Sequence, residues 1–284
     1  MTDRQARDLP LDAHVHTDLS PDGFAAIDDY AASALERGIA EIAITDHVDF
    51  EPGAPAFAYT TFEDRERIVR GAADRWGPQG VDIRFGAEIT YDRSWESDIR
   101  DHLARHAYDF TIGSVHDRVE SPYNPRRVAA WVEGRQLAEV VAPSFDEVEA
   151  AARSGLFDAI GHIDGVKRYL FPHIAPADLE SAPELYEPIL HALVESGTAL
   201  EVNTSGLRYP IERSFPHPAA VARFRELGGR AVTVGSDSHR LDQLSWGLAD
   251  GYAIAADAGF TELTFRRHPG AGRVGVAIPH RIPR

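Results

Sequence analysis

The chain has 284 residues, no cysteine and a formal net charge of −16. Its charged fraction of 26% and hydrophobic fraction of 43% are ordinary for a globular protein, and this length suits one α/β barrel domain. The lack of cysteine excludes disulfides and thiolate metal sites, and the acidity disfavours long nucleic acid and anionic membranes as partners. No apolar run approaches the roughly 18 residues of a membrane span, and no signal peptide is visible. We therefore expect a cytoplasmic protein.

Short apolar runs alternate with helical patterns along the chain, which predicts a parallel sheet covered by helices. The predicted strands cover residues 11–16, 41–45, 81–88, 109–116, 157–162, 198–203, 231–236 and 263–266. The predicted helices cover 24–38, 61–76, a stretch through 131–137, 144–155 behind a capping box at 144–147, 181–197, 221–227 and 241–258. Loops are expected at 52–59, over the mouth of a site, and at 120–127. We expect a single domain over 1–284, with a motif-bearing core at 11–240 and a loose tail at 269–284.

Nearly every predicted strand ends on a side chain that can bind a metal ion. These residues are His14, His16, His47, Glu88, His116, His162, Asn203, Asp237 and His239. In a barrel of parallel strands the C-terminal ends surround one face, where active sites are built. Unrelated core histidines would not occupy this position in one strand after another. The pattern therefore predicts a metal centre at that face.

The turn after the first strand adds Asp22, and nine candidate ligands result when Asn203 is left out. One zinc ion takes about four ligands, so this set predicts two or three divalent ions. Nitrogen and oxygen donors without a thiolate suit Zn, Mn or Fe. The three carboxylates cannot neutralise two or three divalent ions, so the site should attract an anion such as phosphate.

Six short motifs resemble those of the PHP (polymerase and histidinol phosphatase) superfamily, between about residues 11 and 240. They are His14-Val-His16, Thr45-Asp-His47, Gly86-Ala-Glu88, Ser114-Val-His116, Gly161-His162 and Gly235-Ser-Asp-Ser-His239. Residues 161–169 and 200–208 are similar to the histidinol-phosphatase branch. The resemblance implies an α/β fold, a distorted (β/α)7 TIM-like barrel with a trinuclear metal centre. Two positions depart from that branch, Asp46 and the pair Asp117-Arg118 after His116.

The resemblance also implies how the ligands divide among three ions. It groups His14, His16, Glu88 and Asp237; then Glu88, His116 and His162; then Asp22, His47 and His239. Some relatives have histidine where this chain has Asp22, and aspartate there would favour Mn or Fe over Zn. We interpret Asn203 and Asp46 as groups that orient ligands.

Basic residues near strand ends are candidates for binding phosphate. Arg208 is the first choice, because a guanidinium can bind two phosphate oxygens at once. Lys167 and Arg168 are the second choice, and only one of these neighbours should face the site. The residues expected to take part in catalysis are Glu88, Arg208, Asp237 and His239. The remaining histidines, at positions 102, 106, 173, 191, 217, 268 and 280, are predicted to lie on the surface.

The function hypothesis is metal-dependent hydrolysis of a small phosphate monoester by an activated water. The family resemblance makes L-histidinol phosphate, in histidine biosynthesis, the leading substrate. A PHP phosphoesterase or exonuclease acting on nucleotides or short oligonucleotides would use the same ligands. An amidohydrolase also begins with HxH, but Glu88 and the Asp237-x-His239 pair disfavour it. A non-catalytic metal-binding or scaffold domain is disfavoured because every ligand position is filled. The sequence does not indicate the oligomeric state.

Overall fold

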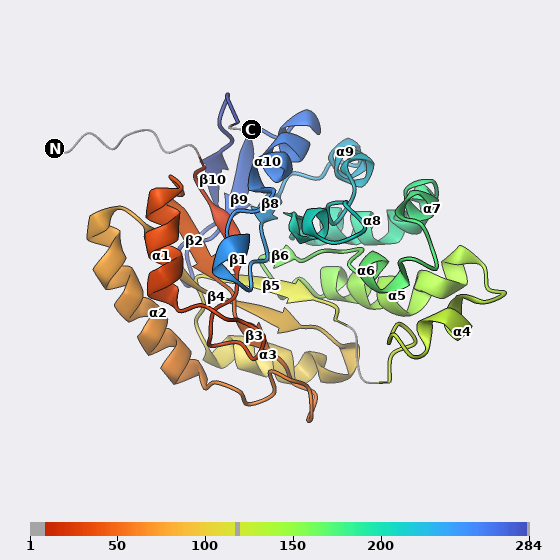
Figure 1. The fold of residues 1–284 in the computed structure, drawn as a ribbon, viewed down its shortest axis with the longest axis horizontal. Helices are drawn as coiled ribbons and strands as arrows, with labels where there is room; N and C mark the ends of the chain where they lie inside the picture. The colour runs from red at the N-terminus through yellow and green to blue at the C-terminus, as the bar shows by residue number, and fades with distance from the viewer. Residues whose placement is uncertain (1–8, 117–119, 283–284) are drawn as a thin grey trace.

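Parallel strands form a nearly closed barrel in the computed structural model, which describes residues 9–116 and 120–282. The strands follow one another around the barrel in the order β1, β2, β4, β5, β6, β7, β8, and the short β3 also pairs with β4 (Figure 1). Their bounds are β1 (Asp12–Val15), β2 (Glu41–Ile44), β3 (His47–Val48), β4 (Asp82–Thr90), β5 (Phe110–Ser114), β6 (Ala159–Ile160), β7 (Ala199–Asn203) and β8 (Val232–Gly235). The predicted α/β barrel of parallel strands is confirmed.

The barrel closes between β1 and β8 through only a few contacts. The Asp237 N–H donates to the His14 carbonyl at 2.8 Å. The carboxylate of Asp12 accepts hydrogen bonds from Ser236 N–H at 2.9 Å and from Ser236 Oγ at 2.6 Å. A Cβ atom on Gly235 would lie 2.3 Å from His14 Cβ, so only glycine lets the two strands approach here. The residues that close the barrel therefore include two of the predicted metal ligands.

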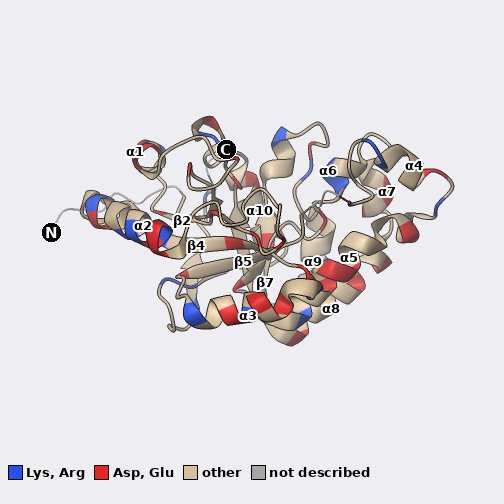
Figure 2. Cartoon of the chain, turned by 90° about the horizontal axis from the view of Figure 1, so that it is seen from below, with Lys and Arg blue, Asp and Glu red and all other residues tan. Residues whose placement is uncertain are grey.

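Helices surround the barrel, with α1 and α2 on one side and α5, α8 and α9 on the other (Figure 1). Their bounds are α1 (Ile27–Glu36), α2 (Phe62–Trp76), α3 (Glu96–Arg105), α4 (Val128–Val132), α5 (Leu137–Ser154), α6 (Lys167–Leu170), α7 (Pro176–Glu180), α8 (Glu187–Ser196), α9 (Pro218–Glu226) and α10 (Leu248–Asp257). Figure 2 shows that acidic side chains gather on α3, α5 and α8. Among the described residues, no helix combines the length and the apolar character needed to cross a bilayer.

Two helices begin at other residues than the sequence predicted. Helix α5 begins at Leu137, because Glu139 accepts the Gln136 N–H at 3.0 Å and forms a capping box there. Ser144, the predicted cap, is buried inside this helix. Ser181 likewise ends α7 and does not begin a helix, and α8 starts only at Glu187. In both cases a short polar motif that is typical of helix starts lies inside or at the end of an earlier helix, and only a short 3₁₀ helix (Pro183–Leu185) separates Ser181 from α8.

The C-terminal segment forms a hairpin and does not join the barrel. Strand β9 (Glu262–Phe265) pairs antiparallel with β10 (Val274–Ala277), so the expectation of a loose tail after residue 269 does not hold for β10. Phe265 is fully buried against Phe110, with ring centroids 4.5 Å apart. Arg266 donates to both oxygens of Asp158, the residue before β6. The hairpin therefore packs at the N-terminal ends of the barrel strands and leaves the opposite end open.

Candidate metal centre

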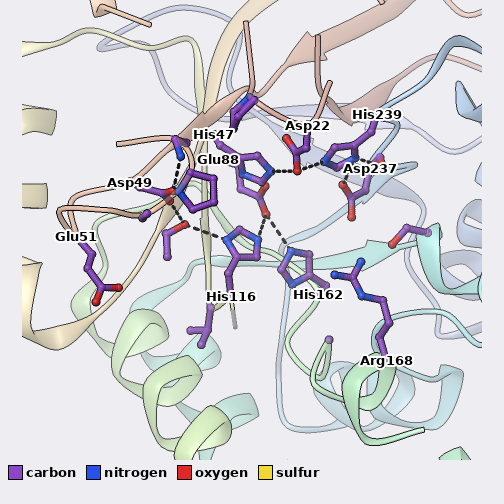
Figure 3. Close-up of a pocket in the computed structure, with 18 of the residues that line it drawn as sticks. Asp22, His47, Asp49, Glu51, Glu88, His116, His162, Arg168, Asp237 and His239 are labelled. Atoms are coloured by element: carbon purple, nitrogen blue, oxygen red, sulfur yellow. Dashed lines mark hydrogen bonds and ion pairs between the residues drawn. The ribbon is translucent and has the colours of Figure 1, made fainter. Parts of the chain in front are cut away.

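The predicted ligands meet at the C-terminal end of the barrel, where the strands and the turns after them bring their side chains to one place (Figure 3). Three of them lie within strands, His14 in β1, His47 in β3 and Glu88 in β4. The others follow strand ends directly or after a short turn, namely His16, Asp22, His116, His162, Asp237 and His239. Side chains that are up to about 220 residues apart in sequence are thereby brought into contact.

Glu88 lies at the centre of the cluster and is almost completely buried. Its Oε2 atom lies 3.0 Å from His47 Nδ1 and 3.3 Å from His16 Nε2. Its Oε1 atom lies 2.9 Å from His162 Nε2 and 3.3 Å from His116 Nε2. His14 Nε2 also lies 3.4 Å from Oε2. The two carboxylate oxygens therefore face different sets of imidazoles, which is the arrangement expected of a carboxylate that is shared between metal ions.

His14, His16 and Asp237 form a second part of the cluster. The Nε2 atoms of His14 and His16 lie 3.0 Å apart, as the spacing of two residues along a strand allows. Asp237 Oδ1 lies 3.4 Å from His16 Nε2 and 3.8 Å from His14 Nε2. The structure therefore brings together the side chains that the sequence assigned to the first ion.

Asp22, His47 and His239 form the third part, at the more exposed edge of the cluster. Asp22 Oδ2 lies 3.5 Å from His47 Nε2 and 3.3 Å from His239 Nε2, and its side chain is 53% exposed. The turn that carries Asp22 therefore reaches the ends of β3 and β8, which are separate in the barrel order. Asp22 contacts both imidazoles that were assigned to the same ion.

The donor atoms are placed as metal coordination requires. Three groups each bring three ligand atoms within 4.8 Å of one another, namely His14/His16/Asp237, His16/His47/His239 and His47/Glu88/His116. Glu88 Oε2 is buried and makes no hydrogen bond of suitable geometry among the described residues, although imidazole nitrogens of His14, His16 and His47 lie within 3.4 Å of it. Buried carboxylate oxygens without a partner are costly unless a cation compensates them. The residues present therefore fit divalent ions bound through nitrogen and oxygen.

The charges of the cluster shift the pKa values of its members. Burial disfavours the protonated imidazole of His47, but the carboxylates of Glu88 and Asp22 raise its pKa to about 10. Burial and the neighbouring imidazoles lower the pKa of His16. Burial also opposes the charged form of Glu88, but the surrounding imidazoles hold its pKa well below the ordinary range. Protons and metal ions therefore compete for the same nitrogens.

Two of the candidate ligands have backbone conformations that non-glycine residues rarely adopt. His162 has a φ of 24° and Asp237 a φ of 53°. Such conformations cost on the order of 1–3 kcal/mol each and occur mainly at functional sites. The energy that keeps them in place comes from the surrounding barrel, which directs His162 toward Glu88 and Asp237 toward His14 and His16.

Glu201, in β7, is a functional residue that the sequence analysis missed. It is completely buried, and its Oε1 accepts from His14 Nδ1 at 2.6 Å. Its Oε2 accepts from the His162 N–H at 2.9 Å and from Asn203 Nδ2 at 3.1 Å. Because the carboxylate holds the Nδ1 proton, the Nε2 lone pair of His14 points into the cluster. The sequence did contain a signal for this role. Glu201 is an acidic residue in an otherwise apolar strand, and because it lies two residues before Asn203, the two side chains share one face of the strand.

Of the two residues expected to orient ligands, Asn203 contacts a ligand through its side chain, whereas Asp46 does so through its backbone carbonyl, which accepts from the Glu88 N–H at 3.3 Å. Asn203 Nδ2 also lies 3.3 Å from Asp237 Oδ2. The carboxylate of Asp46 instead accepts from Thr17 N–H at 2.7 Å and Thr17 Oγ1 at 2.9 Å, and so fixes the turn after β1. The other departure from the histidinol-phosphatase branch, Asp117-Arg118, lies outside the described residues.

The basic side chains near the cluster are placed differently from one another. The Arg208 guanidinium donates to the carbonyl oxygens of Ser236 at 2.7 Å and of Asp237 at 2.5 Å, and Arg208 does not line the cavity above the cluster. Arg168 lines this cavity, which has a volume of about 790 Å³, and points toward His162 and Asp237 (Figure 3). Of the predicted phosphate-binding residues, Arg168 is therefore the one that faces the site.

Two tyrosines hold the Arg168 side chain. Its Nη1 donates to Tyr209 OH at 3.0 Å and its Nη2 to Tyr169 OH at 2.8 Å. The guanidinium carbon also lies 4.8 Å from the centroid of the Tyr169 ring and 5.0 Å from that of Tyr209. Stacking and hydrogen bonding together restrict the rotamers of an otherwise flexible side chain.

Lys167 points away from the site into a buried polar cluster. Its Nζ lies 2.7 Å from Asp164 Oδ2 and donates to the Ser214 carbonyl at 3.1 Å. His217 belongs to the same region, where its ring packs edge-on against Tyr186. His217 is only 4% exposed, so its prediction as a surface residue was wrong. It follows a Phe-Pro pair in a loop, where no periodic pattern of apolar residues indicates burial.

Comparisons with known proteins agree with the motifs. A family profile described as "PHP domain" matches residues 12–205. The chain belongs to the PHP domain family. This PHP domain is 31% identical over 260 residues to a "Probable histidinol-phosphatase" from Deinococcus radiodurans, with 90% of this chain and 96% of the relative covered. It is 28% identical over 258 residues to a "Histidinol-phosphatase" from Lactococcus lactis, with 89% and 93% covered.

A solved structure shares the fold of this PHP domain. It is histidinol phosphate phosphatase from Lactococcus lactis, complexed with zinc, L-histidinol and phosphate. The two folds superpose with a TM-score of 0.77 at 24% sequence identity, over 91% of this chain and 97% of the other. The predicted PHP fold is therefore confirmed.

Proposed function

We propose that this PHP domain hydrolyses L-histidinol phosphate to L-histidinol and inorganic phosphate, with two or three divalent ions bound in its cluster. The observation that carries the proposal is the complete set of nine ligands around the buried Glu88, with Arg168 facing the same cavity. Full-length relatives named histidinol-phosphatase support the choice of substrate within the phosphate esters.

The ions would be held by the three parts of the cluster, with Glu88 shared between the first two. When bound, divalent ions lower the pKa of water and neutralise charge on a phosphate group. The protein's own contribution is to fix the ligands. Glu201 holds the His14 ring, Asn203 contacts Asp237, and the buried Glu88 keeps its charge next to several imidazoles. Zn, Mn and Fe all suit these donors.

Arg168 would bind the phosphate group of the substrate. Its guanidinium is held by Tyr169 and Tyr209 and is directed toward the cluster, so it can donate to non-bridging phosphate oxygens. Arg208, the first choice from the sequence, we assign instead to the placement of Asp237, because it donates to the carbonyl of that residue.

The cavity also has a side that suits a cationic leaving group. Asp49 and Glu51, after β3, and Asp92, after β4, line the cavity, whereas Arg168 follows β6. L-histidinol carries an amino group and an imidazole, both of which can be protonated and are attracted to carboxylates. A nucleoside monophosphate would place a neutral nucleoside there, and an oligonucleotide would add further negatively charged phosphates. This distribution of charge favours histidinol phosphate over the alternative, a PHP phosphoesterase or exonuclease acting on nucleotides or short oligonucleotides.

Initial rates on protein reconstituted with Zn²⁺, Mn²⁺ or Fe²⁺ test the proposal. The substrates are L-histidinol phosphate, p-nitrophenyl phosphate, a nucleoside monophosphate and a short oligonucleotide. We expect kcat/KM for L-histidinol phosphate to exceed that for the other esters by at least about a hundredfold, which corresponds to about 3 kcal/mol. Fast degradation of the oligonucleotide with slow cleavage of all monoesters would support the alternative. A protein that binds metal and cleaves none of these compounds would refute both.

A further inference from the structure

A chain of hydrogen bonds connects the metal cluster to the loop above it. Thr90 Oγ1 lies 2.9 Å from His116 Nδ1, on the side of the ring away from Glu88. The same hydroxyl donates to Asp49 Oδ1 at 2.5 Å. The other carboxylate oxygen, Asp49 Oδ2, accepts the backbone N–H of Ala56 at 3.0 Å. Figure 3 shows this chain as dashed lines from the labelled Asp49 to His116.

The placement of these residues follows from the strands. Thr90 comes two residues after Glu88 in β4, and Asp49 comes two residues after His47. Side chains two apart on a strand share a face, so Thr90 and Asp49 form the next layer above two of the ligands. Both also line the cavity.

The directions of the hydrogen bonds can be assigned. A hydroxyl has one proton, and Thr90 gives it to Asp49, because a carboxylate only accepts. Thr90 Oγ1 can therefore only accept from His116, so the proton of the neutral ring is on Nδ1. The lone pair of His116 is then on Nε2, which faces Glu88 at 3.3 Å. Asp49 thus selects, through Thr90, the tautomer of His116 that can bind a metal ion.

Apolar packing anchors the start of the loop at residues 50–60, and two side-chain hydrogen bonds hold the rest. Phe50 packs against the core and lies edge-on to His102, with ring centroids 5.4 Å apart. Asp49 holds the buried Ala56, and Thr60 Oγ1 donates to the Leu19 carbonyl at 3.0 Å. Phe57 and Tyr59 between these two hydrogen bonds are 44% and 51% exposed, and residues 50–56 line the cavity. The conformation of the segment around Phe57 and Tyr59 therefore depends mainly on the two hydrogen bonds beside it.

We propose that Thr90 and Asp49 are positioning residues that couple the 50–60 loop to the metal ion at His116. A metal ion on Nε2 fixes the His116 ring, and the ring fixes Thr90 and Asp49, which hold the loop over the cavity. By thermodynamic reciprocity, the ordered loop must strengthen metal binding by the same factor by which the metal favours the ordered loop. The inference rests on the proposed metal centre. It adds that the 50–60 loop controls access to this centre.

Two variants and one control test the coupling. Thr90→Val removes the hydroxyl and keeps the shape, and Thr90→Ser keeps the hydroxyl. Thr60→Val loosens the far end of the loop without touching the chain to His116. For each protein we would measure the rate of metal release to a chelator, and the rate of chymotrypsin cleavage at Phe57 and Tyr59 with and without Zn²⁺.

We expect Zn²⁺ to slow cleavage of the wild-type loop and Thr90→Val to lose this protection. Loss of an outer hydrogen bond to a ligating histidine weakens metal binding by roughly tenfold to a hundredfold, so Thr90→Val should release one ion that much faster. Thr90→Ser should restore both properties. Thr60→Val should be cleaved faster with and without metal and should keep the slowing of cleavage by Zn²⁺. Because the loop is coupled to the metal ion, it should also release metal faster than the wild type.

Two results would overturn the coupling. One is a Thr90→Val protein with wild-type metal release, and the other is wild-type protein whose loop is cleaved equally fast with and without bound Zn²⁺. If Thr90→Val does not fold, Asp49→Ala replaces it, because Asp49 lies in a partly exposed loop. Failure of the wild-type protein to bind metal would instead refute the proposed function, so the two failures are distinguishable.

Discussion

Single buried carboxylates determine how the imidazoles of the cluster are presented. Glu201 accepts three hydrogen bonds, from His14 Nδ1, the His162 N–H and Asn203 Nδ2. In Glu201→Gln one oxygen becomes an NH₂ group, which cannot accept, so at least one of these donors loses its partner. The lost hydrogen bond therefore affects residues that belong to, or contact, two different parts of the metal site.

We therefore expect Glu201→Gln to weaken metal binding by roughly tenfold to a hundredfold. Competition with a chromophoric chelator measures this affinity directly. Glu195→Gln is the matched control, because Glu195 is 64% exposed on α8 and, among the residues that the structure describes, forms an ion pair only with Arg153. Equal affinities for the two variants would show that Glu201 has no part in metal binding.

Arg168 gives a second prediction at this scale. A charge-assisted hydrogen bond contributes about 1.5–3 kcal/mol, so Arg168→Ala should raise KM for a phosphate monoester roughly tenfold to a hundredfold. The metal content should not change. Arg213→Ala is the control, since Arg213 is 46% exposed and pairs with Glu180 away from the cluster. An unchanged KM in Arg168→Ala would indicate that Arg208, and not Arg168, binds the phosphate group.

The sequence predicted individual ligands better than the groups that support them. His14 and His16 share a face because they are two residues apart, and this follows from strand geometry alone. Glu201 lies on β7 and reaches His14 on β1, across β8 in the barrel order. No spacing along the chain encodes that contact. The contacts of Arg208 were likewise not predictable from spacing. Its position after a strand suggested phosphate binding, but its guanidinium donates hydrogen bonds to backbone carbonyls.

At the scale of elements, the C-terminal hairpin shows how a barrel can be stabilised from the end opposite its active site. Phe265, in β9, is fully buried against Phe110 at the start of β5. Burial of a phenylalanine ring in a well-packed core is worth about 3–5 kcal/mol relative to alanine. The hairpin should therefore contribute to global stability without contacting the metal centre.

Phe265→Ala should lower the free energy of unfolding by about 3–5 kcal/mol in urea titrations of the metal-free protein. Val274→Ala, at an exposed position of β10 in the same hairpin, should cost no more than about 1 kcal/mol. Similar values for both variants would indicate that the hairpin is not part of the cooperative core.

Most strands were predictable because they are short apolar runs that end on polar side chains. The tail was not, because the apolar run Val-Gly-Val-Ala-Ile at 274–278 is short, contains a glycine and lies among Gly, Arg and Pro residues, and the burial of its side chains depends on β9. Helix starts were misplaced for a related reason. Ser144 and Ser181 both match the composition of a cap, and only the position of free backbone N–H groups decides whether a cap forms.

At the scale of the whole molecule, a strongly acidic protein surrounds a site that must bind both cations and an anion. The acidic residues gather on the outer helices (Figure 2), whereas the ligands of the cluster are mostly imidazoles. The charge of −16 therefore opposes long nucleic acid at the surface without preventing a small phosphate ester from reaching bound cations. The cytoplasmic location and the single domain stay predictions from the sequence.

Proton release on metal binding is the corresponding whole-molecule prediction. The carboxylates around His47 raise its pKa to about 10, so at pH 8 the metal-free protein carries a proton on this imidazole. A metal ion requires the neutral ring, so binding must release that proton, and metal affinity must rise with pH until about pH 10. Calorimetric titration with Zn²⁺ at pH 8, in buffers of different ionisation enthalpy, should give at least about one proton released per protein. A binding heat that does not depend on the buffer would contradict this.

The closure of the barrel between β1 and β8 affects how the protein matures. Asp12 and Ser236, which join across this closure, are 224 residues apart in the chain. During synthesis the first strand, with His14 and His16, emerges long before Asp237 and His239 exist. The first strand therefore has no partner on this side until β8 has left the ribosome, and the metal site cannot be complete before that point. Metal uptake is thus expected to follow the emergence of β8 from the ribosome, and a truncated chain that lacks β8 should retain no tightly bound ions.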